Sequence, residues 1–266
     1  MNYSGNLLKM ESVLSCPVEY YLTFDNKTVL VNNWIEKTLQ FHFTGQINCI
    51  HCGRITSKSF SQGYCYPCFT SLPQTDEGVL RPELNRAHEG ISRDMEWSKK
   101  NDLIDHYVYL SFTSDLKVGV TRHTQIPTRW IDQGAEYAIK FAKTPYRQLA
   151  GLIEVAMKKY LNDKTNWRKM LSGTTQNVPD LISQKRHFSN LIPSELRPYL
   201  ATDHEMTQVI YPVSKYPTKI NSVNLDKHAD FRGLLKGIKG QYLIFDDGSV
   251  FNVRKYNGYY VNISVD

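Results

Sequence analysis

The sequence predicts an α+β protein, and three observations support this fold class. Segments with the apolar alternation of β-strands lie near both ends of the chain. The middle of the chain alternates between strand and helix patterns in the order β-β-α-β-α. Two C-x2-C pairs precede this central unit, with a spacing that is typical of a metal-binding finger.

The first strand region covers residues 18–48. The turn DNK joins VEYYLTF to TVLV, and TLQFHF follows with Leu39, Phe41 and Phe43 alternating. This pattern predicts a β-meander. A second strand region ends the chain, where DDG and KYNG turns separate QYLIF, SVFNV and YYVNISV.

The two strand regions resemble each other. YLTFDNKTVLV begins at Tyr21 and YLIFDDGSVFNV begins at Tyr242, and an aromatic residue, Trp34 or Tyr256, precedes each third strand. Either a chance likeness of two hairpins or an internal duplication would explain this similarity. Since a three-stranded meander is marginal alone, two copies would pack together as one small sandwich or barrel. The ends of the chain would then form one domain.

Residues 49–72 contain the strongest motif, C-x2-C-x12-C-x2-C. Zn²⁺ binds four thiolates in a tetrahedron, and a C-x2-C pair supplies two of them from one turn. Gly53 suits the turn after the first pair. Redox-active cysteines are the alternative, but redox pairs usually open the helix of a βαβ unit. We therefore predict a structural zinc in a treble-clef or ribbon type of finger, with these ligands: Cys49, Cys52, Cys65 and Cys68.

Shifts in composition and turn signals divide the chain into successive segments. We expect an N-terminal β-meander in 1–48, the four-cysteine zinc finger in 49–72, a polar helical or loop linker in 73–104, the central unit in 105–172, a connector in 173–205 and a C-terminal β-meander in 206–266.

The central unit opens on a predicted hairpin, in which the turn FTSD joins YVYLS to LKVGVT. Lys117 and Gly119 share the strand face opposite the valines. If the turn places Tyr109 directly opposite Lys117, both side chains point to the same side of the sheet. Pro127 suits the first turn of a helix that carries Arg129. A third strand, EYAIKFA, and an amphipathic helix, PYRQLAGLIEVAMKKYL, complete the unit.

This order and its marker residues resemble a GIY-YIG nuclease domain. Val108 and Tyr109 stand where the first triplet has Ile-Tyr, and Lys117 to Gly119 stand where the second has Tyr-Ile-Gly. Arg129 falls on the first helix and Glu154 on the second, like the arginine and the metal-binding glutamate of that family. The whole chain, with its cysteine pairs, is also similar to a bacterial family of unknown function.

The resemblance implies phosphodiester hydrolysis of DNA or RNA. Tyr109 would orient or deprotonate the attacking water, and Lys117 and Arg129 would bind phosphate oxygens. Glu154 would ligate one Mg²⁺ or Mn²⁺. The sequence therefore predicts a divalent-metal-dependent nuclease with a structural zinc.

Each of these residues also has a purely structural interpretation. Tyr109 fits a half-buried strand tyrosine, and Lys117 fits a solvent-facing strand lysine. Arg129 fits a surface position on its helix, and Arg122 could take its role. Glu154 has Lys158 four residues on, which fits an exposed ion pair. The joint pattern is what favours a site.

The composition is that of a globular chain, with 22% charged and 41% hydrophobic residues. A net charge of +6 is compatible with a nucleic-acid partner without requiring one. Two other functions therefore stay open. One is a catalytically inactive zinc-containing nucleic-acid-binding module, and the other is a protein-interaction adaptor.

The start of the chain, MNYSGNLLKMESVLSC, lacks the basic and apolar regions of a signal peptide. No apolar run approaches the length of a membrane span. The odd cysteine count, which leaves Cys16 outside the finger, argues against a secreted disulfide framework. We therefore expect a cytoplasmic protein with no membrane partner.

Overall fold

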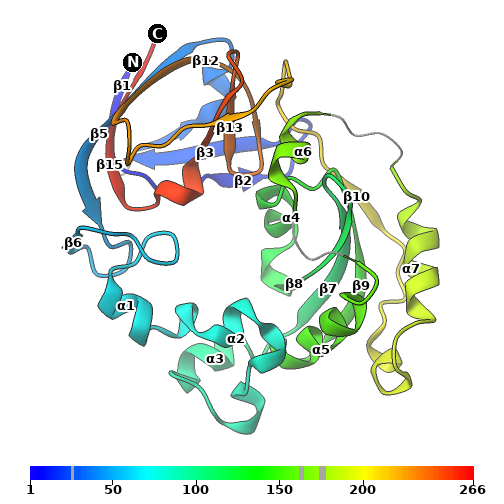
Figure 1. Cartoon of the computed structure of the whole chain (residues 1–266). Coiled ribbons are helices and arrows are strands. Elements are labelled where there is room, and N and C mark those ends of the chain that lie inside the picture. The colour runs from blue at the N-terminus through cyan, green and yellow to red at the C-terminus, as the bar shows by residue number, and fades with distance from the viewer. Residues whose placement is uncertain (25–26, 162–164, 174–177) are drawn as a thin grey trace. The chain divides into compact units, whose positions relative to one another are not determined.

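The structure, a computed structural model, describes residues 1–24, 27–161, 165–173 and 178–266. The chain divides into two compact units (Figure 1). Unit 1 comprises Met1–Phe69, Arg168–Thr174 and Val209–Asp266. Unit 2 comprises Thr70–Trp167 and Thr175–Gln208. Both ends of the chain therefore belong to unit 1, and α6 (Trp167–Leu171) begins at a boundary between the units.

Unit 1 is built mainly of strands. Its elements are β1 (Asn2–Asn6), β2 (Glu11–Val13), β3 (Glu19–Phe24), β4 (Lys27–Leu30), η1 (Val31–Trp34), β5 (Thr38–Asn48), β6 (Ile55–Thr56), α1 (Tyr66–Ser71), β11 (Asn221–Ser222), β12 (Asp230–Lys239), β13 (Tyr242–Phe245), β14 (Ser249–Asn252), η7 (Val253–Tyr256) and β15 (Tyr259–Val265). An eight-stranded sheet has the order β1-β15-β5-β12-β13-β14-β11, with β6 paired to β5. A second sheet has the order β2-β3-β4.

Neither strand region forms the predicted three-stranded meander. The hairpins β3-β4 and β13-β14 are present, but the third strands leave them and pair with each other, β5 with β15. A 3-10 turn redirects the chain after each hairpin, and each turn carries a fully buried aromatic residue, Trp34 in η1 and Tyr256 in η7. Asp25 and Asn26 of the predicted first turn lie outside the described residues.

The strand pairing of unit 1 is symmetric about the pair Phe41 and Ile263. On either side of this pair, Leu39 lies opposite Val265 and Phe43 lies opposite Val261. The first strand of each half pairs with the last strand of the other half, β1 with β15 and β12 with β5. Each half thus runs in the same order, with a strand, a hairpin, a 3-10 turn and a long strand. This arrangement supports an internal duplication.

Unit 2 holds the central part of the chain. Its elements are η2 (Pro73–Thr75), α2 (Glu77–Leu80), η3 (Pro82–Leu84), η4 (Ala87–Glu89), α3 (Met95–Asn101), β7 (His106–Phe112), β8 (Leu116–Arg122), η5 (His123–Gln125), α4 (Thr128–Asp132), β9 (Tyr137–Thr144), α5 (Arg147–Met157), α7 (Leu181–Ser189), η6 (Ser194–Tyr199) and β10 (Met206–Gln208). The expected order of two strands, a helix, a strand and a helix runs from β7 to α5.

The four-stranded sheet of unit 2 has the order β10-β9-β7-β8, so β8 is an edge strand. Strand alternation divides its apolar side chains between two faces. Val108, Leu110 and Ile139 lie in a core cluster with α5 and α7. Tyr109 and Ala138 pack instead with Trp130 of α4. Helices therefore cover both faces beside the edge strand (Figure 1).

Three segments differ from the predicted division of the chain. Residues 73–104 lie within unit 2, where η3 packs against α5. The predicted connector carries α7 and η6, whose Leu181, Phe188 and Leu196 join the core of unit 2 because they bury an apolar stripe. The segment 206–266 begins with β10, which pairs with β9 of unit 2.

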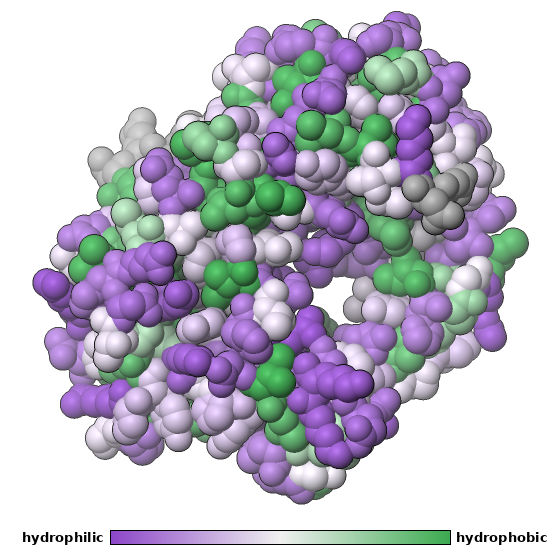
Figure 2. All heavy atoms as spheres, turned by 180° about the vertical axis from the view of Figure 1, so that it is seen from behind, coloured by the Kyte–Doolittle hydropathy of each residue, from purple (hydrophilic) through white to green (hydrophobic). Residues whose placement is uncertain are grey.

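None of the helices in the described ranges combines the length and the apolar content needed to cross a membrane. Figure 2 shows mostly hydrophilic side chains on the face drawn, with hydrophobic side chains in small groups.

Candidate functional site

A polar cleft of about 170 Å³ lies in unit 2 beside the edge strand β8. Its walls come from α2, η3, β7, β8, α4 and α5. The lining residues are Val79, Leu80, Pro82, Tyr109, Val118, Gly119, Val120, Arg129, Gln133, Arg147, Glu154 and Lys158. Three residues proposed from the sequence, Tyr109, Arg129 and Glu154, therefore line one cleft.

Tyr109 lies directly opposite Gly119, and this pairing sets the position of its ring. A Cβ atom on residue 119 would lie 2.5 Å from the Tyr109 hydroxyl oxygen, so only glycine leaves room for the ring. The hydroxyl donates a hydrogen bond to Gln133 Oε1 at 2.7 Å. Tyr109 is therefore a buried tyrosine whose hydroxyl oxygen lies at the cleft.

Burial raises the pKa of Tyr109 above its ordinary value, because the phenolate would lose its hydration. The Arg129 guanidinium opposes this rise, and the Glu154 carboxylate adds to it. Arg129 and Glu154 are therefore close enough to Tyr109 to change its pKa. Tyr109 is therefore a neutral phenol near pH 7.

Glu154 is only 7% exposed, which corrects the expectation of an exposed position. The predicted partner is present, since Lys158 Nζ lies 3.1 Å from Glu154 Oε2. Glu154 is buried, whereas the side chain of Lys158 stays 31% exposed. In the segment before α3, η3 packs against α5. Gly151 permits the approach, because a Cβ atom there would lie 2.2 Å from the backbone nitrogen of Glu83.

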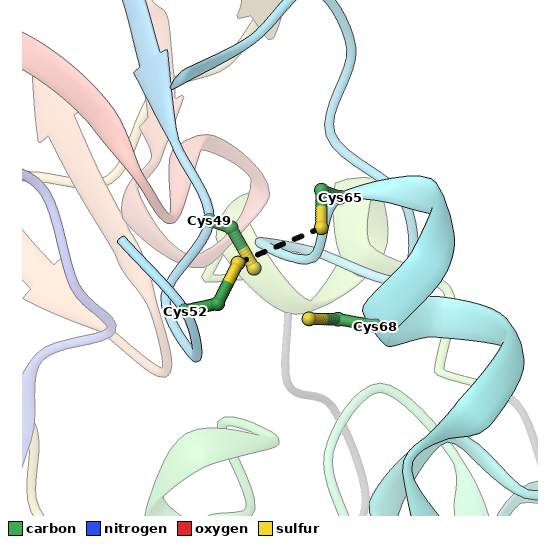
Figure 3. A group of neighbouring side chains, drawn as sticks. All are labelled: Cys49, Cys52, Cys65 and Cys68. Carbon is green, nitrogen blue, oxygen red and sulfur yellow. Dashed lines mark hydrogen bonds between the residues drawn. The ribbon is translucent and has the colours of Figure 1, made fainter. Parts of the chain in front are cut away.

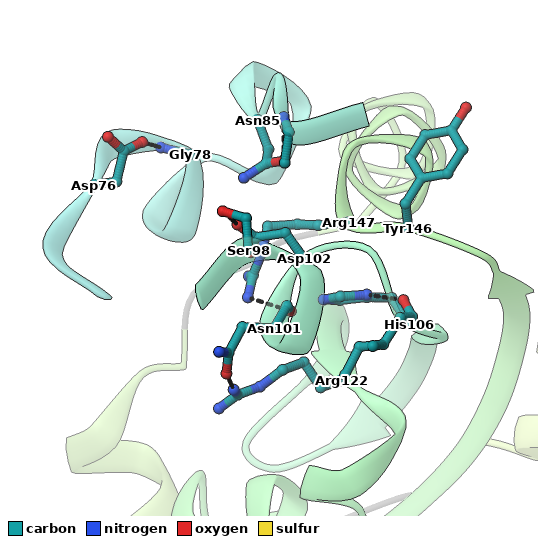
Figure 4. A network of polar contacts seen from close by, with 12 residues as sticks. Asp76, Gly78, Asn85, Ser98, Asn101, Asp102, His106, Arg122, Tyr146 and Arg147 are labelled. Atoms are coloured by element: carbon teal, nitrogen blue, oxygen red, sulfur yellow. Dashed lines mark hydrogen bonds and ion pairs between the residues drawn. The ribbon is translucent and has the colours of Figure 1, made fainter. Parts of the chain in front are cut away.

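Arg147 also lines the cleft, and sequence reasoning missed it. Its Nε donates to Asp102 Oδ1 at 2.6 Å, and both side chains are less than 10% exposed (Figure 4). The hydroxyl of Ser98 donates to the second carboxylate oxygen of Asp102 at 2.8 Å. A cation in the first turn of a helix opposes the helix dipole. That unfavourable placement was the signal in the sequence that Arg147 has an acidic partner or a functional role.

Lys117 does not share this site. It lies opposite Ser111 and not opposite Tyr109, because the FTSD turn pairs Phe112 with Leu116. Its side chain is 3% exposed, and its Nζ donates to Thr165 Oγ1 at 2.7 Å. Arg122, the proposed substitute for Arg129, instead donates to Asn101 Oδ1. The cleft therefore contains Arg129 and Arg147 as its arginines.

The cysteines of the predicted finger meet at one point in unit 1 (Figure 3). The sulfur atoms of Cys49, Cys52, Cys65 and Cys68 all lie within 4.8 Å of one another. The sulfur atoms of Cys52 and Cys65 are 3.8 Å apart. Tetrahedral Zn²⁺ with Zn–S bonds of about 2.3 Å needs sulfur atoms about 3.8 Å apart. The cluster can therefore hold one metal ion, and its sulfur-only ligand set suggests zinc.

Backbone turns hold the cysteine pairs in this arrangement. The N–H of Gly53 donates to the carbonyl of Cys49 at 2.9 Å, and Gly53 has a φ of 73°, which glycine adopts readily. Burial opposes ionisation of Cys49, but backbone N–H groups, first among them that of Cys52, donate to its sulfur and lower its pKa to about 6. A thiolate is thus available at neutral pH, as metal binding requires. His51 is exposed and is not part of the cluster.

A family model described as "Protein of unknown function (DUF2797)" matches residues 36–261. The chain belongs to this family. No curated protein and no solved structure showed significant similarity to this DUF2797 chain. The matched residues include the whole cysteine cluster and every residue that lines the cleft of unit 2. Both candidate sites therefore belong to the part of the chain that defines the family.

Proposed function

We propose that the DUF2797 chain is a divalent-metal-dependent nuclease that hydrolyses phosphodiester bonds of DNA or RNA in the cleft of unit 2. The observation that carries the proposal is the meeting of Tyr109, Arg129 and Glu154, which come from three separate elements, on one polar cleft. The order β7-β8-α4-β9-α5 and the pairing of Tyr109 with Gly119 support a likeness to GIY-YIG nucleases.

Tyr109 would position the attacking water. Gln133 accepts the hydroxyl hydrogen, and the Arg129 side chain also hydrogen-bonds to this hydroxyl. A phenol oxygen has two lone pairs, so one of them is left to accept a hydrogen bond from a water in the cleft. Burial keeps the phenol neutral near pH 7. We therefore assign Tyr109 the role of orienting the water rather than that of a phenolate base.

Two arginines would bind the phosphate. Arg129 and Arg147 line the cleft from α4 and α5, and a guanidinium can hold two phosphate oxygens with parallel hydrogen bonds. Asp102 fixes Arg147 from behind, which limits the entropy lost when the phosphate binds. Arg147 thus takes the part that sequence reasoning gave to Lys117.

Glu154 is the only carboxylate among the described residues that line the cleft, and it would hold Mg²⁺ or Mn²⁺. The donor set fits such a cation, because Mg²⁺ keeps several waters and is often bound through one or two carboxylates and substrate phosphates. When bound, the cation would neutralise charge that develops on the phosphate. Lys158 would have to move from its position 3.1 Å from the carboxylate.

The ion pair of Glu154 with Lys158 also favours a second candidate, a nucleic-acid-binding module without catalysis. In such a protein Lys158 would occupy the place of the cation, and the arginines would still bind a phosphate. The two functions differ in one measurable property, which is cleavage that requires a divalent metal.

The test is cleavage of mixed single- and double-stranded DNA and RNA by the purified chain with Mg²⁺ or Mn²⁺. We expect cleavage with the cation and none without it. Glu154→Gln keeps the size of the side chain and removes its charge, so the rate should fall by about 10² or more. Tyr109→Phe should also slow cleavage, because the water loses its acceptor.

Glu96→Gln is the matched control. Glu96 also lies on a helix and pairs with a lysine, Lys99, but its side chain is 77% exposed and it lies outside the cleft. This variant should cut at the wild-type rate. A wild-type chain that binds nucleic acid and never cuts would favour the binding module. Cleavage that survives both Glu154→Gln and Tyr109→Phe would place the activity elsewhere.

A further inference from the structure

A second polar pocket, of about 420 Å³, lies within unit 1. One wall is the stretch between the two cysteine pairs, with Ser57, Lys58 and Ser59. The other wall comes from the second half of the duplicated fold, with Lys255 and Tyr259. The pocket is therefore formed where the metal-binding segment meets the β-structure, in a part of the chain that the cleft of unit 2 does not use.

Two lysines without a carboxylate partner line this pocket. Among the described residues, neither Lys58 nor Lys255 forms an ion pair. Lys58 Nζ lies 5.2 Å from the centre of the Phe60 ring. Lys255 Nζ lies 4.8 Å from the centre of the Tyr256 ring and donates to its hydroxyl at 3.1 Å. Aromatic faces thus hold both ammonium groups in place while their charge stays uncompensated.

The other polar groups of the pocket suit an oxyanion. The Oγ atom of Ser59 is buried and has no hydrogen-bond partner among the described residues, so its hydroxyl is available as a donor. Asp226 is the one carboxylate in the described lining, and its Oδ1 already accepts the hydroxyl of Tyr259 at 2.8 Å. The described lining of the pocket therefore has two cations and one engaged anion, so the lining itself is net positive.

The surrounding sequence favours a polyanion over a small ion. No Asp or Glu occurs between Glu36 and Asp76, so no carboxylate of the metal-binding segment would repel an extended anion. Tyr66 is 59% exposed, and the Phe60 ring lies 5.4 Å from it in an edge-on contact. The same Phe60 ring contacts Lys58, so Tyr66 is an exposed aromatic ring in a basic segment, which is suited to stack on an unpaired base.

We propose that this pocket binds a backbone phosphate of a nucleic acid, with Lys58 and Lys255 as the charged contacts and the Ser59 hydroxyl as a donor. The choice of a nucleic acid rests on the proposed function, whereas the binding of a phosphate group rests on the pocket alone. The pocket would hold the nucleic acid at a place other than the scissile bond.

The experiment measures anisotropy of a fluorescent single-stranded oligonucleotide bound to the full zinc-loaded chain, without Mg²⁺ or Mn²⁺, from low to high salt. Each phosphate contact contributes about 0.7 to the slope of log K against log salt for single strands. Lys58→Ala and Lys255→Ala should each lower the slope by about that amount and weaken binding about five-fold at 0.1 M salt. Lys215→Ala, at an exposed position of unit 1 outside the pocket, should change neither value.

Two controls complete the design. Thermal melting and zinc content of each variant must match the wild type, and Ser59→Ala provides a second, uncharged test that should weaken binding with little change in slope. Competition with inorganic phosphate at constant ionic strength separates the sources of the phosphate group. We expect millimolar phosphate to leave the oligonucleotide bound.

If both lysine variants bind the oligonucleotide with the wild-type affinity and salt slope, the proposal is wrong. It is also wrong if Lys215→Ala loses as much affinity and slope as the pocket variants. Displacement of the oligonucleotide by phosphate at low millimolar concentration would make the pocket a small-anion site and overturn the nucleic-acid assignment. This experiment measures binding and not cleavage, so a negative result would not bear on the proposed nuclease activity. A chain that shows this binding and never cuts would contradict only the nuclease.

Discussion

At the level of single residues, the pairing of Tyr109 with Gly119 sets where the phenol lies. Strand alternation correctly put Tyr109, Lys117 and Gly119 on one face. It did not fix the register, which depends on how many residues the turn uses. The register differs from the expected one by two residues, so that Gly119 and not Lys117 lies opposite Tyr109, and Lys117 lies opposite Ser111.

Gly119→Ala tests this arrangement. The added Cβ would lie 2.5 Å from the Tyr109 hydroxyl oxygen and 2.7 Å from its ring carbon, so the ring must move. We expect a loss of about 1–3 kcal/mol in urea unfolding and a large loss of cleavage. Adding Tyr109→Phe, which removes the closest atom, should restore part of the stability. Unchanged stability in the single variant would contradict the packing of the Tyr109 ring against Gly119.

Because the pKa of His106 is lowered in the folded chain, we expect the free energy of unfolding to depend on pH. Burial, with the nearby Arg147 guanidinium, lowers its pKa to about 4 from the ordinary 6.5, although Asp102 acts in the opposite direction. The unfolded chain therefore takes up a proton before the folded chain does, and stability falls as the pH drops from 6.5 to 4, by at most about 3 kcal/mol.

His106→Asn isolates this contribution. The amide can keep the hydrogen bond that His106 Nδ1 forms with the carbonyl of Ile104 at 2.8 Å, and it does not titrate. Denaturant unfolding at pH 7 and pH 4.5 should show a smaller acid loss in the variant. An equal acid loss in both proteins would mean that other groups cause it.

At the scale of elements, the segment from η2 to α3 is the part that sequence reasoning placed least well. Its polar, charged composition is typical of a linker, yet η3 packs on α5 and helps to wall the cleft. Its close contact with α5 at Gly151 is made by the backbone of Pro82 and Glu83, and a backbone contact leaves no apolar periodicity in the sequence. Arg147 and Gln133 were missed for a related reason, because their roles depend on which elements meet.

Gly151→Ala tests the contact between this segment and α5. In an isolated helix the change stabilises by about 1 kcal/mol. Here the Cβ atom would lie 2.2 Å from the Glu83 nitrogen and 2.5 Å from the Pro82 carbonyl carbon, and backbone cannot give way cheaply. We therefore expect a lower melting temperature, faster proteolysis within residues 73–91 and weaker cleavage. A more stable variant would show that the segment does not pack on α5 in solution.

At the scale of the whole molecule, the sequence similarity between YLTFDNKTVLV and YLIFDDGSVFNV indicated two related halves in unit 1. The hairpins could be predicted because their alternation is local. The exchange of long strands between the halves could not be predicted, because β5 and β15 are far apart in sequence and no local pattern records their pairing. The four-cysteine cluster was the easiest feature, because its ligands lie within 20 residues of one another and follow a fixed spacing.

Removal of residues 209–266 tests the joint fold of the two chain ends. The deletion takes away β12 and β15, the two neighbours of β5 in the main sheet. With both edges of β5 exposed, the N-terminal part should aggregate or lose its structure. The measurement is soluble yield and circular dichroism of chain 1–208. A soluble product whose N-terminal part melts as before would contradict a shared fold.

The proposed nuclease depends on a divalent cation bound by Glu154 in the cleft of unit 2, which Tyr109 and two arginines also line. Anomalous diffraction from crystals soaked with Mn²⁺ tests it most directly, because the peak locates the metal without an assay of activity. We expect a peak about 2 Å from the Glu154 carboxylate, with Lys158 moved away. A cleft without a peak at saturating Mn²⁺, with Lys158 still paired to Glu154, would contradict it.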